Sequence, residues 1–299
     1  MHFSGVYTAI VTPLLNGKVD YSSLQRLVEF QISGGVTGLV VVGTTGESPT
    51  LNSEEHLDVV RRTIAIAAGR VQVFAGTGSN STEEAVYYTQ SAVEAGADGV
   101  LQVAPYYNKP TQEGLFHHFS AVAAVCDKPI MLYSIPGRCI IEIGIETCAR
   151  LREAFPQIKI MKEAGGSCDR VGNLVNRMGE DYWVLSGDDS LTVPFMSAGA
   201  CGVVSVASNL YPAEITDMVQ QVRNNNVHGA THLHLQMLPF FHGIFKEPNP
   251  VPIKYLMKRH GLISSDEVRL PLSALAEDTR SQMDQLFSQM PAPSGLENV

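Results

Sequence analysis

The chain has 299 residues, of which 44% are hydrophobic and 17% charged, so it can bury a large core and form a single barrel-sized domain. Its formal net charge is -9 and it has no basic run interleaved with aromatic residues, which argues against a nucleic-acid partner. Five cysteines without a CxxC pair indicate neither a disulfide framework nor a zinc cluster. Because there is no basic leader and no membrane-length apolar window, we expect a cytoplasmic protein with no membrane partner.

Eight short apolar runs recur along the chain, and their spacing of roughly 20 to 33 residues suits a strand, a helix and two turns. The runs are residues 5–11, 38–42, 71–75, 99–104, 130–133, 158–162, 183–186 and 202–206. Helix start signals lie between them, such as Ser81 followed three residues later by Glu84, the pattern of a capping box. Eight such units predict a (β/α)8 TIM barrel. An open doubly wound sheet is the alternative, although no GxGxxG motif follows the first run.

Strand signals stop after Pro212, and the remaining chain reads as helices, including one near residues 226–246 and another near 273–290. We therefore predict an α/β protein with a C-terminal helical extension. Residues 1–224 would form the barrel that carries the active site, and residues 225–299 the helical region.

Lys162 ends the sixth apolar run, where a strand gives way to a glycine-containing turn. Strand alternation places it on the same face as Ile158 and Ile160. If that face is the barrel interior, burial lowers the pKa of the amine and makes it a nucleophile toward carbonyls, as in a Schiff-base lysine. The alternative is a strand-end lysine whose ammonium reaches solvent.

Other polar groups follow the neighbouring runs, at the barrel end where active sites of this fold lie. Tyr133 ends the fifth run, and adjacent strands about 4.8 Å apart would bring its phenol near the amine of Lys162. The turn from Gly43 to Gly46 offers N–H groups and two hydroxyls for a carboxylate, or is an ordinary glycine-rich turn. Arg138 could hold a second carboxylate, or be a solvated loop residue.

Two other clusters could suggest a metal. His228 and His232 have helical spacing, but no carboxylate or cysteine at ligand spacing supports them. Asp188 and Asp189 follow the seventh run, where adjacent acids also suit a helix start, which is the favoured interpretation. We predict no metal site.

Four motifs in the same order and spacing resemble the pyruvate-dependent class I aldolases and lyases over nearly the whole chain, and among these most closely the dihydrodipicolinate synthase family. They are Gly43-Thr-Thr-Gly-Glu47, Pro105-Tyr-Tyr-Asn108, Tyr133-x-x-Pro-x-Arg138 and Lys162-Glu-Ala. The resemblance implies condensation of pyruvate with L-aspartate 4-semialdehyde in the diaminopimelate route of lysine biosynthesis. Arg138 favours this family, because N-acetylneuraminate lyases and related sugar-acid aldolases usually have an apolar residue there.

The resemblance also implies a role for each matching residue. Lys162 forms a covalent imine with pyruvate, so no cofactor is needed, and Tyr133, Thr44 and Tyr107 form a proton relay. The substrate-binding residues are Thr45 and Gly46 for the pyruvate carboxylate, Arg138 for the semialdehyde carboxylate, and Gly187 and Val204 along the pocket. The family places the equivalent of Tyr107 across a subunit interface, which implies a homo-oligomer, usually a homotetramer built as a dimer of dimers.

Lysine is a common feedback inhibitor in this family and is therefore a possible effector here. The matching residues are Ser48, His56, Asn80, Glu84 and Tyr106. Pro49 and Ser53 replace residues that are more often alanine and histidine in lysine-sensitive relatives, so we expect weakened but retained inhibition. Alternatively, these side chains only cap helices and pack an interface.

Two other functions remain open from sequence. One is a pyruvate-dependent aldolase or lyase acting on a sugar acid, and the other is a barrel that binds pyruvate or lysine without turnover. The presence of Lys162, Tyr133 and Arg138 together argues against the second.

Overall fold

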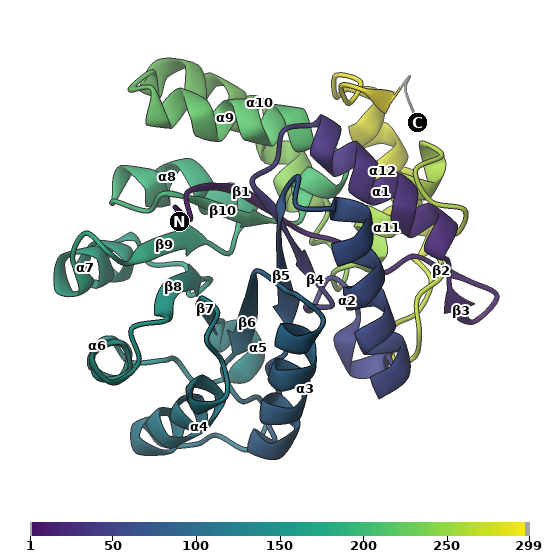
Figure 1. Cartoon of the computed structure of the whole chain (residues 1–299). Helices are drawn as coiled ribbons and strands as arrows, with labels where there is room; N and C mark the ends of the chain where they lie inside the picture. The colour runs from purple at the N-terminus through teal and green to yellow at the C-terminus, as the bar shows by residue number, and fades with distance from the viewer. Residues whose placement is uncertain (1, 297–299) are drawn as a thin grey trace.

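The computed structural model describes residues 2–296, and its centre is a closed barrel of eight parallel strands in the order β1-β10-β9-β8-β7-β6-β5-β4 (Figure 1). The barrel strands are β1 (Gly5–Ala9), β4 (Gly38–Val41), β5 (Gln72–Gly76), β6 (Gly99–Val103), β7 (Ile130–Ser134), β8 (Ile158–Glu163), β9 (Trp183–Ser186) and β10 (Gly202–Ser205). Each predicted apolar run is one of these strands. The predicted TIM barrel is confirmed, and the open-sheet alternative is wrong.

Helices form a ring around the strands (Figure 1). They are α1 (Tyr21–Ser33), α2 (Ser53–Ala67), α3 (Thr82–Glu94), α4 (Gln112–Ala124), α5 (Pro136–Cys139), α6 (Ile145–Ala154), α7 (Cys168–Met178), α8 (Thr192–Ser197) and α9 (Pro212–Arg223). The capping box predicted for α3 is only half present: Ser81 accepts a hydrogen bond from Glu84 N, but its own N–H donates to Ser79 Oγ. A complete box, between Asn52 and Glu55, starts α2 instead.

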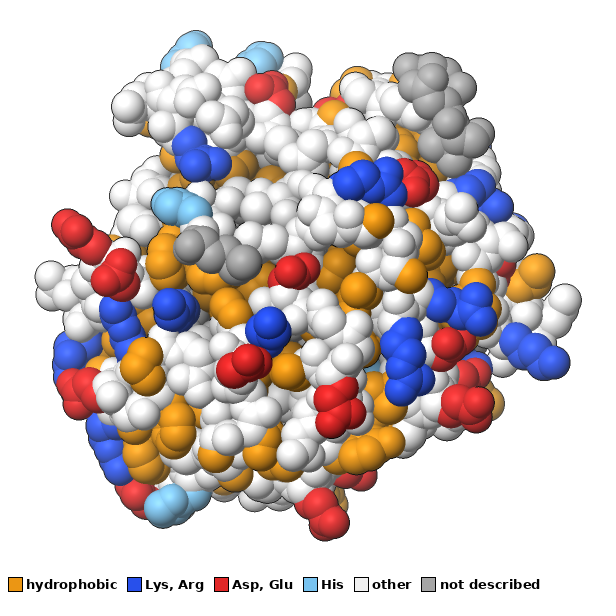
Figure 2. Space-filling view, in the orientation of Figure 1, with side chains coloured by type: hydrophobic (Ala, Val, Ile, Leu, Met, Phe, Trp, Pro, Cys, Tyr) orange, Lys and Arg blue, Asp and Glu red, His pale blue; other side chains and the backbone are white. Residues whose placement is uncertain are grey.

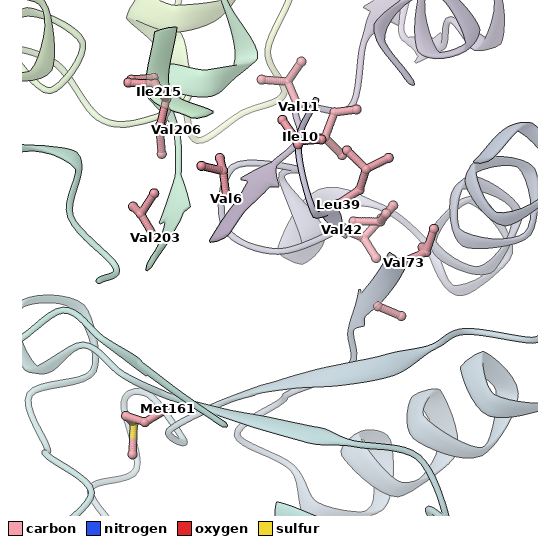
Figure 3. Packing of buried hydrophobic residues seen from close by; sticks show 14 of the residues in the cluster. Val6, Ile10, Val11, Leu39, Val42, Val73, Met161, Val203, Val206 and Ile215 are labelled. Atoms are coloured by element: carbon pink, nitrogen blue, oxygen red, sulfur yellow. The ribbon is translucent and has the colours of Figure 1, made fainter. Parts of the chain in front are cut away.

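Two apolar clusters stabilise the barrel. One lies between the strands and the helices, and Figure 3 shows part of it, including Val6, Leu39 and Val203. The other fills the interior and includes Tyr7, Phe74 and Ile160. Because alternate strand residues point to opposite faces, interior placement of Ile160 sends Lys162 inward as well.

Ile158 departs from the predicted common face with Ile160, since it packs in the outer cluster. The pairing of β7 with β8 shifts register there: Ile130 pairs with Ile158, but Met131 pairs with Ile160. Such an irregularity lets one residue leave the alternation. The predicted common face is therefore correct for Ile160 and Lys162 and wrong for Ile158.

The C-terminal region is helical, as predicted. It contains α10 (Val227–Gly243), α11 (Val251–Arg259) and α12 (Glu277–Ser288), so α11 is an addition to the two helices predicted there. Helix α12 packs against α10 and α11, and α11 reaches the short 3-10 helix η3 (Ala207–Asn209) beside β10. The division at residue 224 stays a prediction, and residues 297–299 of the predicted region lie outside the described residues.

Smaller elements complete the fold. A hairpin of β2 (Leu14–Leu15) and β3 (Lys18–Val19) was not predicted, and the other 3-10 helices are η1 (Ser48–Thr50) and η2 (Asp189–Leu191). Figure 2 shows acidic and basic side chains interspersed over the face in view. Within residues 2–296, no helix combines the length and the apolar character needed to cross a membrane.

Candidate active site

Lys162 lies near the carboxyl end of β8 with its side chain in the barrel interior, only 5% exposed. Tyr133 is its register partner on β7, as the sequence predicted. The ammonium nitrogen Nζ lies 4.1 Å from the centroid of the Tyr133 ring. The solvent-reaching alternative for this lysine is wrong, because the amine is enclosed by the barrel.

Burial lowers the pKa of Lys162 to about 7, with a smaller effect in the same direction from Arg138. The negative charge of Asp189 opposes that shift. A substantial fraction of the amine is therefore neutral near neutral pH, and only the neutral amine has the lone pair that attacks a carbonyl.

Asp189 was missed as a site residue. Its neighbour Asp188 caps η2 by accepting a hydrogen bond from Ser190 N, but Asp189 is only 2% exposed and accepts hydrogen bonds from the N–H groups of Val206 at 2.9 Å and Ala207 at 3.0 Å. Burial raises the pKa of Asp189 to about 6, against the effect of these bonds and of one from Ser205. The predicted helix-cap role is thus correct for Asp188 and wrong for Asp189, whose charge acts on Lys162.

The phenol of Tyr133 is buried, and Thr44 lines the same cavity and lowers the pKa of the phenol against the larger effect of burial. Burial raises the pKa of Tyr133 well above its ordinary value, so the phenol keeps its proton near neutral pH. A protonated phenol beside an amine and a threonine hydroxyl can donate and accept protons in sequence. The first two members of the predicted relay therefore line one cavity.

The predicted carboxylate turn is compact, with hydrogen bonds within its own backbone and one from Thr12. Gly46 N donates to Gly43 O at 3.1 Å, and Thr12 Oγ1 donates to Gly46 O at 2.7 Å. A Cβ on Gly46 would lie 2.8 Å from Val42 Cα, so a larger residue does not fit there. Thr45 is buried within this turn.

A cavity of about 240 Å³ opens above these residues. Its lining includes Thr44, Tyr133 and Arg138 from the predicted active site, together with Ser48 and Tyr106 from the predicted lysine site. Lys162, Thr45, Gly46, Gly187 and Val204 are not among the lining residues. The cavity thus reaches Thr44, Tyr133 and Arg138, and the Lys162 amine lies against the ring of Tyr133.

Gly187 packs against the lysine side chain, and Val204 lies in the barrel interior. A Cβ on Gly187 would lie 3.2 Å from Lys162 Cε and 2.8 Å from Ala164 Cβ, so glycine leaves room for the lysine. Val204 belongs to the interior cluster that includes Tyr133. Gly187 therefore shapes the surroundings of the lysine, and neither residue offers a polar side chain.

Arg138 lies on the short helix α5, exposed toward the cavity, and Cys139 follows it in a buried position. Burial raises the pKa of the Cys139 thiol to about 11, although Arg138 opposes the shift. The thiol is therefore protonated at neutral pH and is a poor nucleophile. Arg138, by contrast, presents a guanidinium at the mouth of the site.

Comparison with known proteins shows the family, because residues 2–290 match the Dihydrodipicolinate synthetase family. The chain belongs to this family. It is 48% identical over 280 residues to the 4-hydroxy-tetrahydrodipicolinate synthase of Leptospira biflexa, covering 94% of this chain and 95% of that protein. It is 42% identical over 291 residues to the Bacillus subtilis enzyme, covering 97% and 100%.

A solved structure of the same enzyme, from Methylacidiphilum fumariolicum SolV, is similar with a TM-score of 0.95 and 48% identity, over 96% of each chain. The chain is accordingly an enzyme with 4-hydroxy-tetrahydrodipicolinate synthase activity, a lyase of lysine and diaminopimelate biosynthesis. The sugar-acid aldolase and the non-catalytic barrel considered from sequence are set aside.

Tyr107, predicted as the third member of the family's relay, lies away from the cavity of its own chain. Its side chain is 87% exposed, and its backbone adopts a positive φ of 74°. The adjacent Tyr106 lines the cavity instead. The placement of Tyr107 in a neighbouring subunit stays a prediction.

Of the residues matched to the family's lysine site, Ser48 and Tyr106 line the cavity. Asn80 Nδ2 donates to Tyr106 O at 3.2 Å, and Glu84 accepts from Ser79 Oγ at 2.8 Å. His56 is buried and stacked on Tyr88, with ring centroids 4.3 Å apart. Burial lowers the pKa of His56 to about 4, so the ring is neutral and can accept from an ammonium.

His228 and His232 are both exposed on α10. Within residues 2–296, no three His, Cys, Asp or Glu side chains gather closely enough to hold a metal ion.

Proposed function

We propose that the enzyme works through an imine between pyruvate and Lys162. The observation that carries this proposal is the buried amine at the end of β8, with its pKa lowered to about 7 and Tyr133 against it. The neutral amine attacks the ketone carbon of pyruvate, and the ketone oxygen leaves as water. A covalent mechanism of this kind uses no cofactor.

The imine then acts as an electron sink. Loss of a proton from the pyruvate methyl group gives an enamine, whose carbon attacks the aldehyde carbon of L-aspartate 4-semialdehyde. The aldehyde oxygen takes up a proton, and ring closure by the amino group of the semialdehyde displaces Lys162 from the former ketone carbon. Tyr133 and Thr44 line the same cavity, which supports their roles as the groups that move these protons.

Two carboxylates must be held during this sequence. The turn that contains Thr45 and Gly46 suits pyruvate, since backbone N–H groups and a hydroxyl bind an anion without burying a full positive charge. Arg138 suits the semialdehyde, because its planar guanidinium can form two parallel hydrogen bonds to a carboxylate. Gly187 and Val204 would bound the pocket between them.

The imine assignment is tested by borohydride reduction in the presence of pyruvate, followed by peptide mass analysis. We expect one reduced pyruvate adduct on the peptide that contains Lys162. Protein treated with borohydride alone is the control. An unmodified Lys162 peptide, or an adduct on another lysine, would refute the assignment.

The rate with pyruvate should depend on pH through Lys162. Because the ammonium cannot attack, kcat/KM for pyruvate should rise about tenfold per pH unit in acid and level off above a pKa of about 7. In Asp189→Asn, loss of the negative charge that opposes the shift should move this rise in kcat/KM to lower pH. A rise centred near pH 10.5, the ordinary lysine value, would contradict the lowered pKa.

The active assembly that we propose is a homotetramer, a dimer of dimers that acts in the cytoplasm. The exposed phenol of Tyr107 supports it, since this side chain can complete the relay only in a neighbouring subunit. A related dihydrodipicolinate synthase from Acinetobacter baumannii has been solved in complex with pyruvate. Another similar structure is a monomeric dihydrodipicolinate synthase variant. Sedimentation together with activity of a Tyr107→Phe variant tests the arrangement.

Lysine should inhibit this enzyme, more weakly than it inhibits sensitive relatives. The related structure from Cyanidioschyzon merolae contains bound lysine, and the acceptors matched to such a site, among them Glu84 and neutral His56, are present here. At position 53, lysine-sensitive relatives often have histidine. Here that residue is Ser53, whose Oγ lies 3.0 Å from the hydroxyl of Tyr88. We expect partial inhibition at millimolar lysine that Glu84→Gln weakens further; activity unaffected by lysine would remove the proposal.

A further inference from the structure

Asn249, in the C-terminal helical region, reaches into the carboxylate turn. Its Nδ2 donates a hydrogen bond to Thr45 Oγ1 at 2.9 Å, across more than two hundred positions of sequence. Asn249 is only 6% exposed and lies two residues before α11 begins at Val251. A residue that looked from sequence like part of an appendage therefore touches a predicted substrate-binding hydroxyl.

This hydrogen bond determines what the Thr45 hydroxyl can do. A hydroxyl has one proton to donate and can accept at its lone pairs. Because Thr45 accepts from Asn249, its own proton is left to point elsewhere, and a substrate carboxylate is an acceptor of the kind it needs. Without Asn249, the hydroxyl would be free to rotate.

A second group of contacts from the same region fixes the other end of the turn. Lys254 Nζ donates to Glu47 Oε1 at 2.6 Å, and Arg269 N donates to Glu47 Oε2 at 3.0 Å. Glu47 adopts a left-handed backbone, φ 56°, which is costly for a non-glycine residue and needs support from its surroundings. The turn is thus held at Thr45 and at Glu47 by one segment, residues 249–269.

Asn249 is a poor choice for packing alone. Its Oδ1 is buried and finds no hydrogen-bond partner among the described residues. A buried amide with one unsatisfied end costs stability compared with an apolar side chain of similar size. The bond to Thr45 is what the asparagine provides that an apolar residue would not.

We infer that Asn249 is a positioning residue for pyruvate: it orients the Thr45 hydroxyl so that the proton faces the pyruvate carboxylate. The inference rests on the proposed role of Thr45. It makes the C-terminal helical region part of the active site, because the residue that prepares the carboxylate turn comes from outside the barrel strands and their loops.

The test compares steady-state kinetics of Asn249→Ala, Thr45→Val and the double variant, with thermal unfolding of each. We expect KM for pyruvate to rise about tenfold in Asn249→Ala, the size of one hydrogen bond to a charged group. The KM for aspartate 4-semialdehyde should stay unchanged. The double variant should be no worse than Thr45→Val, because both substitutions remove the same oriented hydroxyl.

The matched control is Asn226→Ala, which removes an exposed cap of α10 in the same region and should leave KM for pyruvate unchanged. Asn249→Asp is a second variant, for use if the alanine variant folds poorly. An ionised aspartate can only accept a hydrogen bond, so the Thr45 hydroxyl should donate to it and no longer to the pyruvate carboxylate. KM for pyruvate should then rise further. Equal losses for both substrates, or additive losses in the double variant, would overturn the inference. If Thr45→Val itself leaves KM for pyruvate unchanged, the proposed role of Thr45 fails as well.

Discussion

Lys162→Met is expected to lower kcat by at least about 1000-fold, since removal of a covalent nucleophile costs more than that in other enzymes. The reason is chemical: methionine fills a similar volume but has no amine to form the imine. The protein should stay folded, because the wild-type site already disfavours the charged ammonium, as the lowered pKa shows. Initial rates with pyruvate and aspartate 4-semialdehyde measure the loss, and denaturant unfolding measures the stability.

Lys159→Met is the matched control, because Lys159 lies on the same strand. It stands between Ile158 and Ile160, where the pairing with β7 shifts register. It is partly exposed and lies outside the interior cluster, so its loss should leave kcat nearly unchanged. Near-normal activity in Lys162→Met, with borohydride adducts on another lysine, would place the nucleophile elsewhere.

The barrel and the pairing of Lys162 with Tyr133 could be predicted because both follow from periodic patterns. Apolar runs at regular spacing predict parallel strands, and consecutive strands of a barrel are neighbours. The register then places Tyr133 opposite Lys162, and the structure has this pair. Local pattern and barrel topology agree here, so the sequence was sufficient.

Asp189 could not be assigned in this way. From sequence, Asp188 and Asp189 are two acids before a helix, and both satisfy the same capping rule. Only the fold separates them, because Asp189 turns inward to the N–H groups that follow β10. The signal that could have indicated a site role for Asp189 is its position at the carboxyl end of a barrel strand, where active sites of this fold lie.

Asn249 and Lys254 gave no signal at all. They lie in a segment without strand periodicity, and their partners, Thr45 and Glu47, are about two hundred positions earlier. Contacts at such separations are set by how α11 docks on the barrel. The chemistry of the turn was therefore predictable, while the groups that hold it were not.

Lys254→Met is expected to destabilise the protein by about 3–5 kcal/mol, the cost of leaving a buried charge without its partner. The side chains of Lys254 and Glu47 are 0% and 1% exposed, and their atoms lie 2.6 Å apart. Burial lowers the pKa of Lys254 while Glu47 opposes that shift, so the charge of Lys254 depends on its partner. Denaturant midpoints of the variant and the wild type measure the difference.

Lys258→Met is the control on the same helix, since its ion pair with Asp266 is partly exposed and should contribute no more than about 1 kcal/mol. The double variant Lys254→Met, Glu47→Gln separates two causes of instability. It removes the orphaned charge, and the amide oxygen can still accept from Arg269 N, so most of the stability should return. If the double variant is as unstable as Lys254→Met alone, the loss comes from packing around α11 and not from the uncompensated carboxylate.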